Sequence, residues 1–66
     1  MDLQKLNETI NASGLKKVSI ADRIGMTKGQ FYMKCLGHSS WRVEEAQAFC
    51  EALNLTQKQR NEIFFP

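Results

Sequence analysis

The sequence predicts an all-α domain built from five short helices. Apolar residues recur at spacings of three and four along several stretches, as they do on one face of an α-helix. Residue types that start and stop helices separate these stretches, and no alternation of apolar and polar residues predicts a β-strand. Because the chain has 66 residues and no repeat or low-complexity linker, we expect a single domain spanning residues 1–66.

Two helices are predicted in the N-terminal part of the chain. The first is expected to lie between an Asp2 N-cap and a stop at Gly14. The second is expected to begin around Lys17, with Ser19 as a rival N-cap, and to end at Gly25. Their apolar faces are formed by Leu3, Leu6 and Ile10 in the first helix and by Ile20, Ala21 and Ile24 in the second.

The three later helices have stronger start signals. Thr27 and Thr56 each precede a glutamine by three positions, which is the pattern of a capping box. The third helix should therefore begin at Lys28, and the fifth just after Thr56. Between them, Asn54 suits a left-handed stop for the fourth helix. The apolar positions expected on the inner faces are Phe31 and Cys35 in the third helix and Val43, Ala46, Phe49, Cys50 and Leu53 in the fourth. The fifth helix is expected to end near Ile63, Phe64 and Phe65.

Positive charge is concentrated in one segment of the chain. The formal net charge is only +2, yet residues 15–34 hold five Lys or Arg side chains against one Asp. Residues 1–14 and 43–66 are both net negative. A basic segment of this kind is the electrostatic footprint of a polyanion-binding protein, although a solvated helix face gives the same count.

The sequence lacks the signals of an enzyme, a metal site or a membrane protein. A chain this short buries only about 60% of its unfolded surface, which leaves little room for an active-site cleft. It has no glycine-rich phosphate loop, and Cys35 and Cys50 match neither a disulfide framework nor a zinc spacing. No apolar run approaches the roughly 20 residues of a membrane span. We expect a cytoplasmic binding protein without catalytic activity, cofactor or metal.

The stretch from Leu15 to Gly37, LKKVSIADRIGMTKGQFYMKCLG, has the features of two helices that cross through a short turn. Ala21 lets the helices approach, Gly25 takes the turn conformation, and Phe31 fills the angle between them. This stretch resembles the helix-turn-helix region of the phage Cro and repressor proteins, the Cro/C1-type, XRE-like family. The segments EEAQAFCEALNLT and QRNEIFF also fit that family, so the resemblance covers almost the whole chain.

The resemblance implies a lambda-repressor-like fold of five helices, with the helix-turn-helix at helices 2 and 3. It also implies a function, that of a sequence-specific transcriptional regulator that binds double-stranded DNA. The closing QRNEIFF looks like the tail of small Cro-type regulators from phages and prophages. A Cro-like repressor that reads a two-fold related operator through the major groove is therefore the expected role.

The resemblance places the base-reading side chains on the first turns of the third helix. Lys28 is able to donate to guanine, and Tyr32 and Met33 are able to meet a thymine methyl group. Gly29 either lets the helix N-terminus come close to phosphate or is simply tolerated there. Gln30 has two competing roles, in the capping box and at a base. The expected base-reading set is Thr27, Lys28, Gly29, Gln30, Tyr32 and Met33.

Phosphate contacts are expected on both sides of that helix, from Lys16, Lys17, Lys34, His38, Ser39, Ser40 and Arg42. Lys17 matches a phosphate-contacting position of the family, or else is a solvated lysine. Arg42 either reaches a phosphate or serves only as the N-cap position of the fourth helix. Lys34 departs from the family, which usually has an apolar residue there. Either Lys34 snorkels past its neighbours, or the third helix is rotated and the base-reading set shifts by one residue.

Apolar residues near the C-terminus predict self-association. Ile63 and Phe64 are able to close the domain against the first helix, which leaves Leu55 and Phe65 as a small surplus patch. The expected dimerisation residues are Leu55, Phe64 and Phe65. Because this patch is too small for a permanent interface, we expect a monomer or weak homodimer in solution that becomes a dimer on DNA.

A second class of function shares the predicted fold. A protein-interaction module, such as an antitoxin or a repressor modulator, would use the same helices to hold a protein partner. Such a module normally needs a partner-binding segment beyond the domain, and the five predicted helices leave none spare. The sequence therefore favours double-stranded DNA as the main partner.

Overall fold

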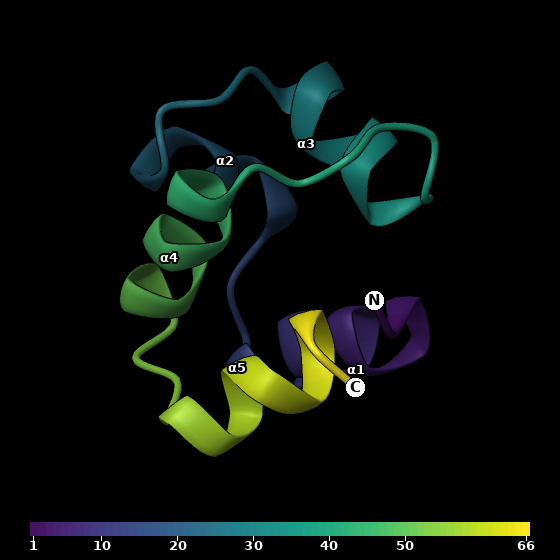
Figure 1. Ribbon diagram of the computed structural model, residues 1–66. Helices are drawn as coiled ribbons and strands as arrows, with labels where there is room; N and C mark the ends of the chain where they lie inside the picture. The colour runs from purple at the N-terminus through teal and green to yellow at the C-terminus, as the bar shows by residue number, and fades with distance from the viewer.

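Five α-helices follow one another along the chain in the computed structural model, which describes residues 1–66 (Figure 1). They are α1 (Leu3–Ser13), α2 (Lys17–Arg23), α3 (Lys28–Cys35), α4 (Val43–Ala52) and α5 (Gln57–Phe64). There is no β-strand, and the helices form one body of 26 × 23 × 20 Å. The all-α, five-helix prediction is therefore confirmed. None of the helices has the length and apolar character needed to cross a membrane.

The predicted capping residues set most of the helix boundaries. The Asp2 carboxylate accepts a hydrogen bond from the Lys5 N–H across 3.0 Å at the start of α1. At α3, Thr27 and Gln30 form a full capping box, in which each side chain accepts the backbone N–H of the other residue. Thr56 opens α5 in the same way. These local signals are sufficient to place three helix starts correctly.

The turn between α2 and α3 depends on Gly25. α2 begins at Lys17, so the rival start at Ser19 is wrong. Gly25 has a φ of 76°, in the left-handed region where a side chain is strained. Directly after it, the Met26 N–H donates to the Ala21 carbonyl across 2.9 Å and closes the turn. The chain can therefore leave α2 and enter α3 within four residues.

All five helices contribute to one core of nine buried residues, Leu6, Ile10, Ile20, Ala21, Phe31, Cys35, Phe49, Cys50 and Ile63. Phe31 is fully buried and stacks on Phe49 with a ring-centroid distance of 6.2 Å. Trp41, which follows α3, meets Phe31 edge to face at 6.1 Å. Val43 was expected on the buried face of α4 but is 76% exposed, because it lines an open hollow beside Trp41 and Phe65 instead of the core. Contacts between these aromatic rings therefore pack α3 against α4.

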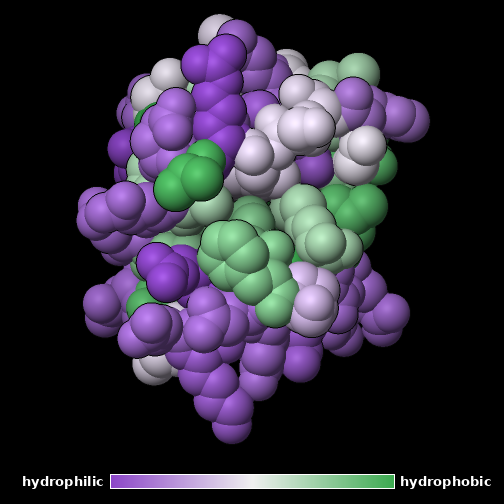
Figure 2. All heavy atoms as spheres, in the orientation of Figure 1, coloured by the Kyte–Doolittle hydropathy of each residue, from purple (hydrophilic) through white to green (hydrophobic).

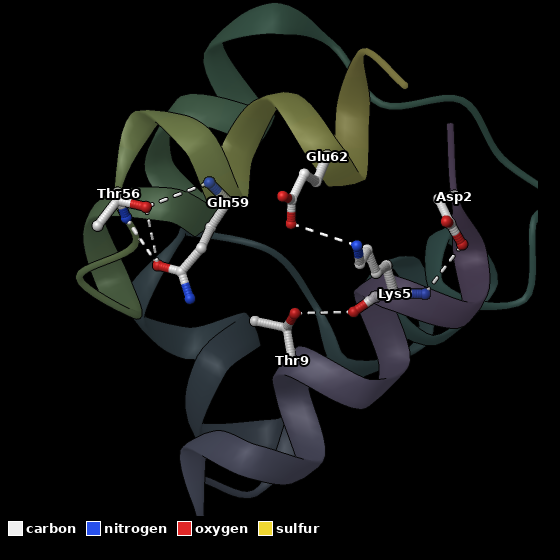
Figure 3. A network of polar contacts seen from close by, with 6 residues as sticks. All are labelled: Asp2, Lys5, Thr9, Thr56, Gln59 and Glu62. Atoms are coloured by element: carbon white, nitrogen blue, oxygen red, sulfur yellow. Dashed lines mark hydrogen bonds and ion pairs between the residues drawn. The ribbon is translucent and has the colours of Figure 1, made fainter.

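α1 and α5 lie side by side and bring the two ends of the chain together (Figure 1). The Asp2 N–H donates to the Ile63 carbonyl across 2.7 Å, and Ile63 is buried beside α1 as expected. Figure 3 shows the exposed ion pair that also joins these helices, between the Lys5 ammonium and the Glu62 carboxylate at 3.3 Å. This pair of helices closes the side of the core away from the α2–α3 turn.

Candidate nucleic-acid interface

The inner face of α3 is fixed by packing, which leaves its outer face free. Phe31 and Cys35 point inward and are buried as predicted, against Ile20 and Ala21 of α2. Lys34 lies on the same buried face of α3 as these two residues. The six residues expected to read bases are all exposed, and they occupy the N-cap and outer face of α3: Thr27, Lys28, Gly29, Gln30, Tyr32 and Met33.

Gly29 and Gln30 have different surroundings at the start of α3. A Cβ atom built on Gly29 would meet no protein atom within 4 Å, so no internal contact requires glycine at this position. The Gln30 side-chain oxygen accepts the Thr27 N–H across 3.1 Å, so this oxygen is occupied by the capping box. Of the two roles expected for Gln30, the structure shows the one in the capping box of α3. The backbone at Gly29 is open to the outside of the protein.

Two lysine ammonium groups lie near the ring of Tyr32. The Lys17 ammonium is 5.4 Å and the Lys28 ammonium 5.5 Å from the centroid of the Tyr32 ring. Such cation–π contacts hold exposed side chains in place at a modest energy. The contact between Lys28 and Tyr32 follows from their spacing of four on one helix, a signal available in the sequence. The contact with Lys17 comes from α2 and requires knowledge of the way the two helices cross.

Six of the seven residues expected at phosphates are at least partly open to solvent. Lys16, His38, Ser39, Ser40 and Arg42 are exposed, and Lys17 is half-buried. An open groove runs between the outer face of α3 and the start of α4, and it joins members of both expected sets. Its lining residues are Gly29, Gln30, Met33, Lys34, Ser39, Arg42 and Glu45.

Lys34 differs from the expected phosphate contact. The residue is only 8% exposed, and its ammonium group is 2.6 Å from the Ser40 carbonyl oxygen and 3.0 Å from a Glu45 carboxylate oxygen. The Ser39 hydroxyl lies 3.5 Å from the same nitrogen. Three internal acceptors thus surround an ammonium group that has three hydrogens. Its stem follows the core while its head group turns to the next loop, so Lys34 is removed from the phosphate set.

Glu45 joins Lys34 to the N-terminus of α4. Its carboxylate oxygen Oε1 accepts the Arg42 N–H across 2.8 Å, which caps the helix from its third position. Partial burial alone would raise the pKa of the Glu45 carboxyl, but the hydrogen bond from Arg42 and the charge of Lys34 outweigh it and hold the pKa below its ordinary value. The guanidinium of Arg42 takes no part in the cap and stays exposed.

The three residues expected at a dimer contact lie on two different surfaces. Leu55 is half-buried against the core and lines an open hollow with Asn54 and Arg60. Phe64 is half-buried, with its ring 5.2 Å from that of Trp41. Phe65, in contrast, is 63% exposed. Leu55 therefore belongs to the edge of the core, apart from the two phenylalanines.

Phe64 and Phe65 contribute to an apolar patch that extends beyond the residues predicted for self-association. The patch consists of Met1, Trp41, Val43, Phe64 and Phe65, which line one hollow. Three of its members are large side chains with 49–76% exposure, namely Met1, Val43 and Phe65. Hydrophobic side chains also gather in the middle of the face shown in Figure 2. Contacts between both chain ends and the start of α4 build this patch, so no local sequence signal marks it.

No residues are assembled for metal binding or thiol chemistry. No group of three or more His, Cys, Asp or Glu side chains is placed to hold a metal ion. Cys35 and Cys50 are free and buried, and burial raises the pKa of both thiols above the ordinary value. The thiols therefore stay protonated, which makes them poor nucleophiles and metal ligands.

Comparison with known proteins adds no family assignment, because no family model, curated protein or solved structure matches this chain. Inference about function therefore depends on the residues themselves. Three features form the candidate site: the exposed outer face of α3, the cations beside it, and the groove that leads to the start of α4.

Proposed function

We propose that this protein is a sequence-specific transcriptional regulator that binds double-stranded DNA, of the phage or prophage Cro-like class. In this proposal α2 and α3 form the helix-turn-helix of a lambda-repressor-like domain, and α3 enters the major groove. One observation carries the proposal: a helix fixed from within by Phe31 presents Lys28, Tyr32 and Met33 outward, beside a glycine with empty space next to it. A cytoplasmic location belongs to the same proposal.

Each exposed group has a role that suits its chemistry. Lys28 donates to guanine O6 or N7, while Tyr32 and Met33 contact thymine methyl groups. Gly29 allows the N-terminus of α3 to approach a phosphate, where its free N–H groups and positive dipole end favour an anion. The groups left for other phosphates are Lys16, Lys17, His38, Ser39, Ser40 and Arg42.

Self-association is also part of the proposal. A second copy that pairs through a two-fold axis would place two α3 helices about 34 Å apart, one turn of DNA, and would require a two-fold related operator. The exposed apolar patch around Phe65 is the surface that supports this contact. Only five residues form it, whereas a standard interface uses about 20–30 residues a side, so the dimer is weak without DNA.

Selection from a random duplex pool at two salt concentrations tests the proposed function. We expect one sequence motif to be enriched at both concentrations, because base contacts add to the salt-dependent phosphate attraction. Lys58→Ala on α5 serves as a matched control, since it removes an exposed lysine away from α3. If the protein binds all duplexes equally at low salt and none at the higher salt concentration, sequence-specific readout is contradicted.

A protein-interaction module on the same fold is the second candidate, and the exposed apolar patch is the observation that favours it. The two candidates make opposite predictions for substitutions. A DNA-binding regulator loses function when Lys28 is replaced and keeps half-site binding when Phe65 is replaced. An antitoxin or repressor modulator that holds its partner through the patch loses function on replacement of Phe65 and is indifferent to Lys28.

A further inference from the structure

Lys34 is a buried cation whose partners come from two other segments of the chain. The residue lies on the last turn of α3, beside the buried Cys35. Its ammonium group contacts the Ser40 carbonyl in the connection between α3 and α4, and the Glu45 carboxylate in the first turn of α4. The same carboxylate holds the Arg42 N–H. One ammonium group therefore links α3, the connecting segment and the start of α4.

Burial of this ammonium group costs free energy unless each of its N–H groups has a hydrogen-bond acceptor. A buried ammonium group without partners is strongly unfavourable, whereas this one has three oxygen atoms within 3.5 Å. A buried ion pair adds little net stability compared with apolar residues of similar volume, and its best-attested use is to specify one geometry. Here the geometry specified is the position of residues 39–42 relative to α3.

We propose that Lys34 is a positioning residue that sets the phosphate-facing segment Ser39–Arg42 against α3, and that it does not contact DNA itself. Through Ser40 and Glu45 it fixes the backbone on which the exposed Arg42 guanidinium stands. Base-reading and phosphate-binding groups then have one relative placement before DNA arrives. This inference rests on the proposed DNA-binding function, but its first test requires no DNA.

Amide hydrogen exchange in Lys34→Met gives that first test. Methionine keeps the length and apolar volume of the stem and removes the ammonium group. We expect exchange at the Arg42 N–H to accelerate about tenfold or more, because Glu45 and Ser40 lose their common partner. The amide of Leu53, bonded to the Phe49 carbonyl at the far end of α4, is the internal control and should not change. Unchanged exchange at Arg42 would overturn the proposal whether or not the protein binds DNA.

Double substitution provides the test on DNA. If Lys34 acts by placing Arg42, Lys34→Met and Arg42→Ala each weaken operator binding about tenfold, and together they weaken it by little more than either alone. Lys16→Ala, at the start of α2, should instead combine with Lys34→Met additively. Additive loss for Lys34 and Arg42 would overturn positioning. It would leave either a direct contact or a general loss of stability, which thermal unfolding of the variants separates.

Glu45→Gln gives the same information if Lys34→Met does not fold. The amide oxygen of glutamine still accepts the Arg42 N–H, so the helix cap is kept while the ion pair is lost. We expect amide exchange at Arg42 to accelerate, but less than in Lys34→Met. On DNA, the combined effect of Glu45→Gln and Arg42→Ala on operator affinity should again be less than the sum of the two single effects. If both variants keep slow exchange at Arg42, the positioning role is wrong. If exchange responds but wild type selects no DNA motif, only the proposed function is wrong.

Discussion

The lysines on the α1–α5 side of the molecule and those on the α2–α3 side differ in their ion pairing. On the first side, Lys5 is paired with Glu62 at 3.3 Å, in the polar network of Figure 3. On the second, Lys16, Lys17 and Lys28 form no ion pair, although Asp22 lies in the same segment. An unpaired lysine keeps its full charge for an outside partner, whereas a paired one is already partly neutralised. Lys58 on α5 is also unpaired, so pairing alone does not distinguish the two sides; what distinguishes the α2–α3 side is that several unpaired lysines lie within one short segment.

The largest expected effect separates the two faces of α3. Phe31→Ala should destabilise the protein by about 3–5 kcal/mol, because it empties the centre of the aromatic core, and this can unfold a domain of small total stability. Tyr32→Ala, the adjacent substitution on the exposed face, should change stability by less than about 0.5 kcal/mol. Thermal unfolding followed by circular dichroism measures both. A Phe31→Ala protein that keeps its melting temperature would show that the α3 register is wrong.

A second effect divides the unpaired lysines by role. Lys28→Ala should relax preference at one base pair, at a cost of about 1–3 kcal/mol, because a base-edge contact is lost. Lys17→Ala should weaken binding to all duplexes alike and reduce the salt dependence, as loss of a phosphate contact does. Binding of each variant to a panel of single-base operator variants, at two salt concentrations, measures the difference. An equal loss on every sequence for both variants contradicts this division.

A third and smaller effect concerns the apolar patch on the α1–α5 side. Phe65→Ser should lower affinity for a two-fold operator about tenfold, or ~1.4 kcal/mol, because the second protomer loses its contact. Affinity for a half-site should not change. Complex mass during operator titration gives the stoichiometry, with two protomers expected for wild type. A steady one-to-one complex on a palindromic site, unaffected by Phe65→Ser, would rule out the dimer.

The smallest effect is confined to acid pH and tests the one buried cation on the α2–α3 side. Burial raises the pKa of Glu45, but the hydrogen bond from the Arg42 N–H and the charge of Lys34 outweigh it, so the folded pKa is lowered. The stabilisation is therefore complete above the unfolded value of about 4.3 and is lost as the pH falls through the lower folded value. Urea unfolding at pH 7 and pH 3 should show a weaker acid loss in Glu45→Gln than in wild type. Glu44→Gln, on an exposed neighbour, should behave as wild type does.

Local signals account for the parts of the fold that the sequence predicts well. Asp2, Thr27 and Thr56 start helices because their side chains satisfy nearby N–H groups, which requires no tertiary contact. Gly25 and Asn54 have positive φ values at helix ends for similarly local reasons. The exposed outer face of α3 followed from the same reasoning, because burial of Phe31 fixes the direction of its neighbours.

The parts that sequence reasoning missed depend on contacts between distant segments. Lysine is a charged residue type that normally lies at the surface, and Lys34 is buried only because Ser40 and Glu45 provide partners for its ammonium group. Val43 fits the apolar period of α4, but the period carries no information on where the core ends. Leu55 and Phe65 looked equivalent as surplus residues, and only the path of α5 separates them.

Trp41 is the only tryptophan in the chain, and its place among Phe31, Phe49 and Phe64 makes it a natural optical probe. Its indole also lines the exposed patch with Val43 and Phe65. Its emission therefore depends on two events, loss of the aromatic core on unfolding and coverage of the patch by another molecule. Folding and association can be followed in one cuvette, without a label, by the wavelength and intensity of a single fluorophore.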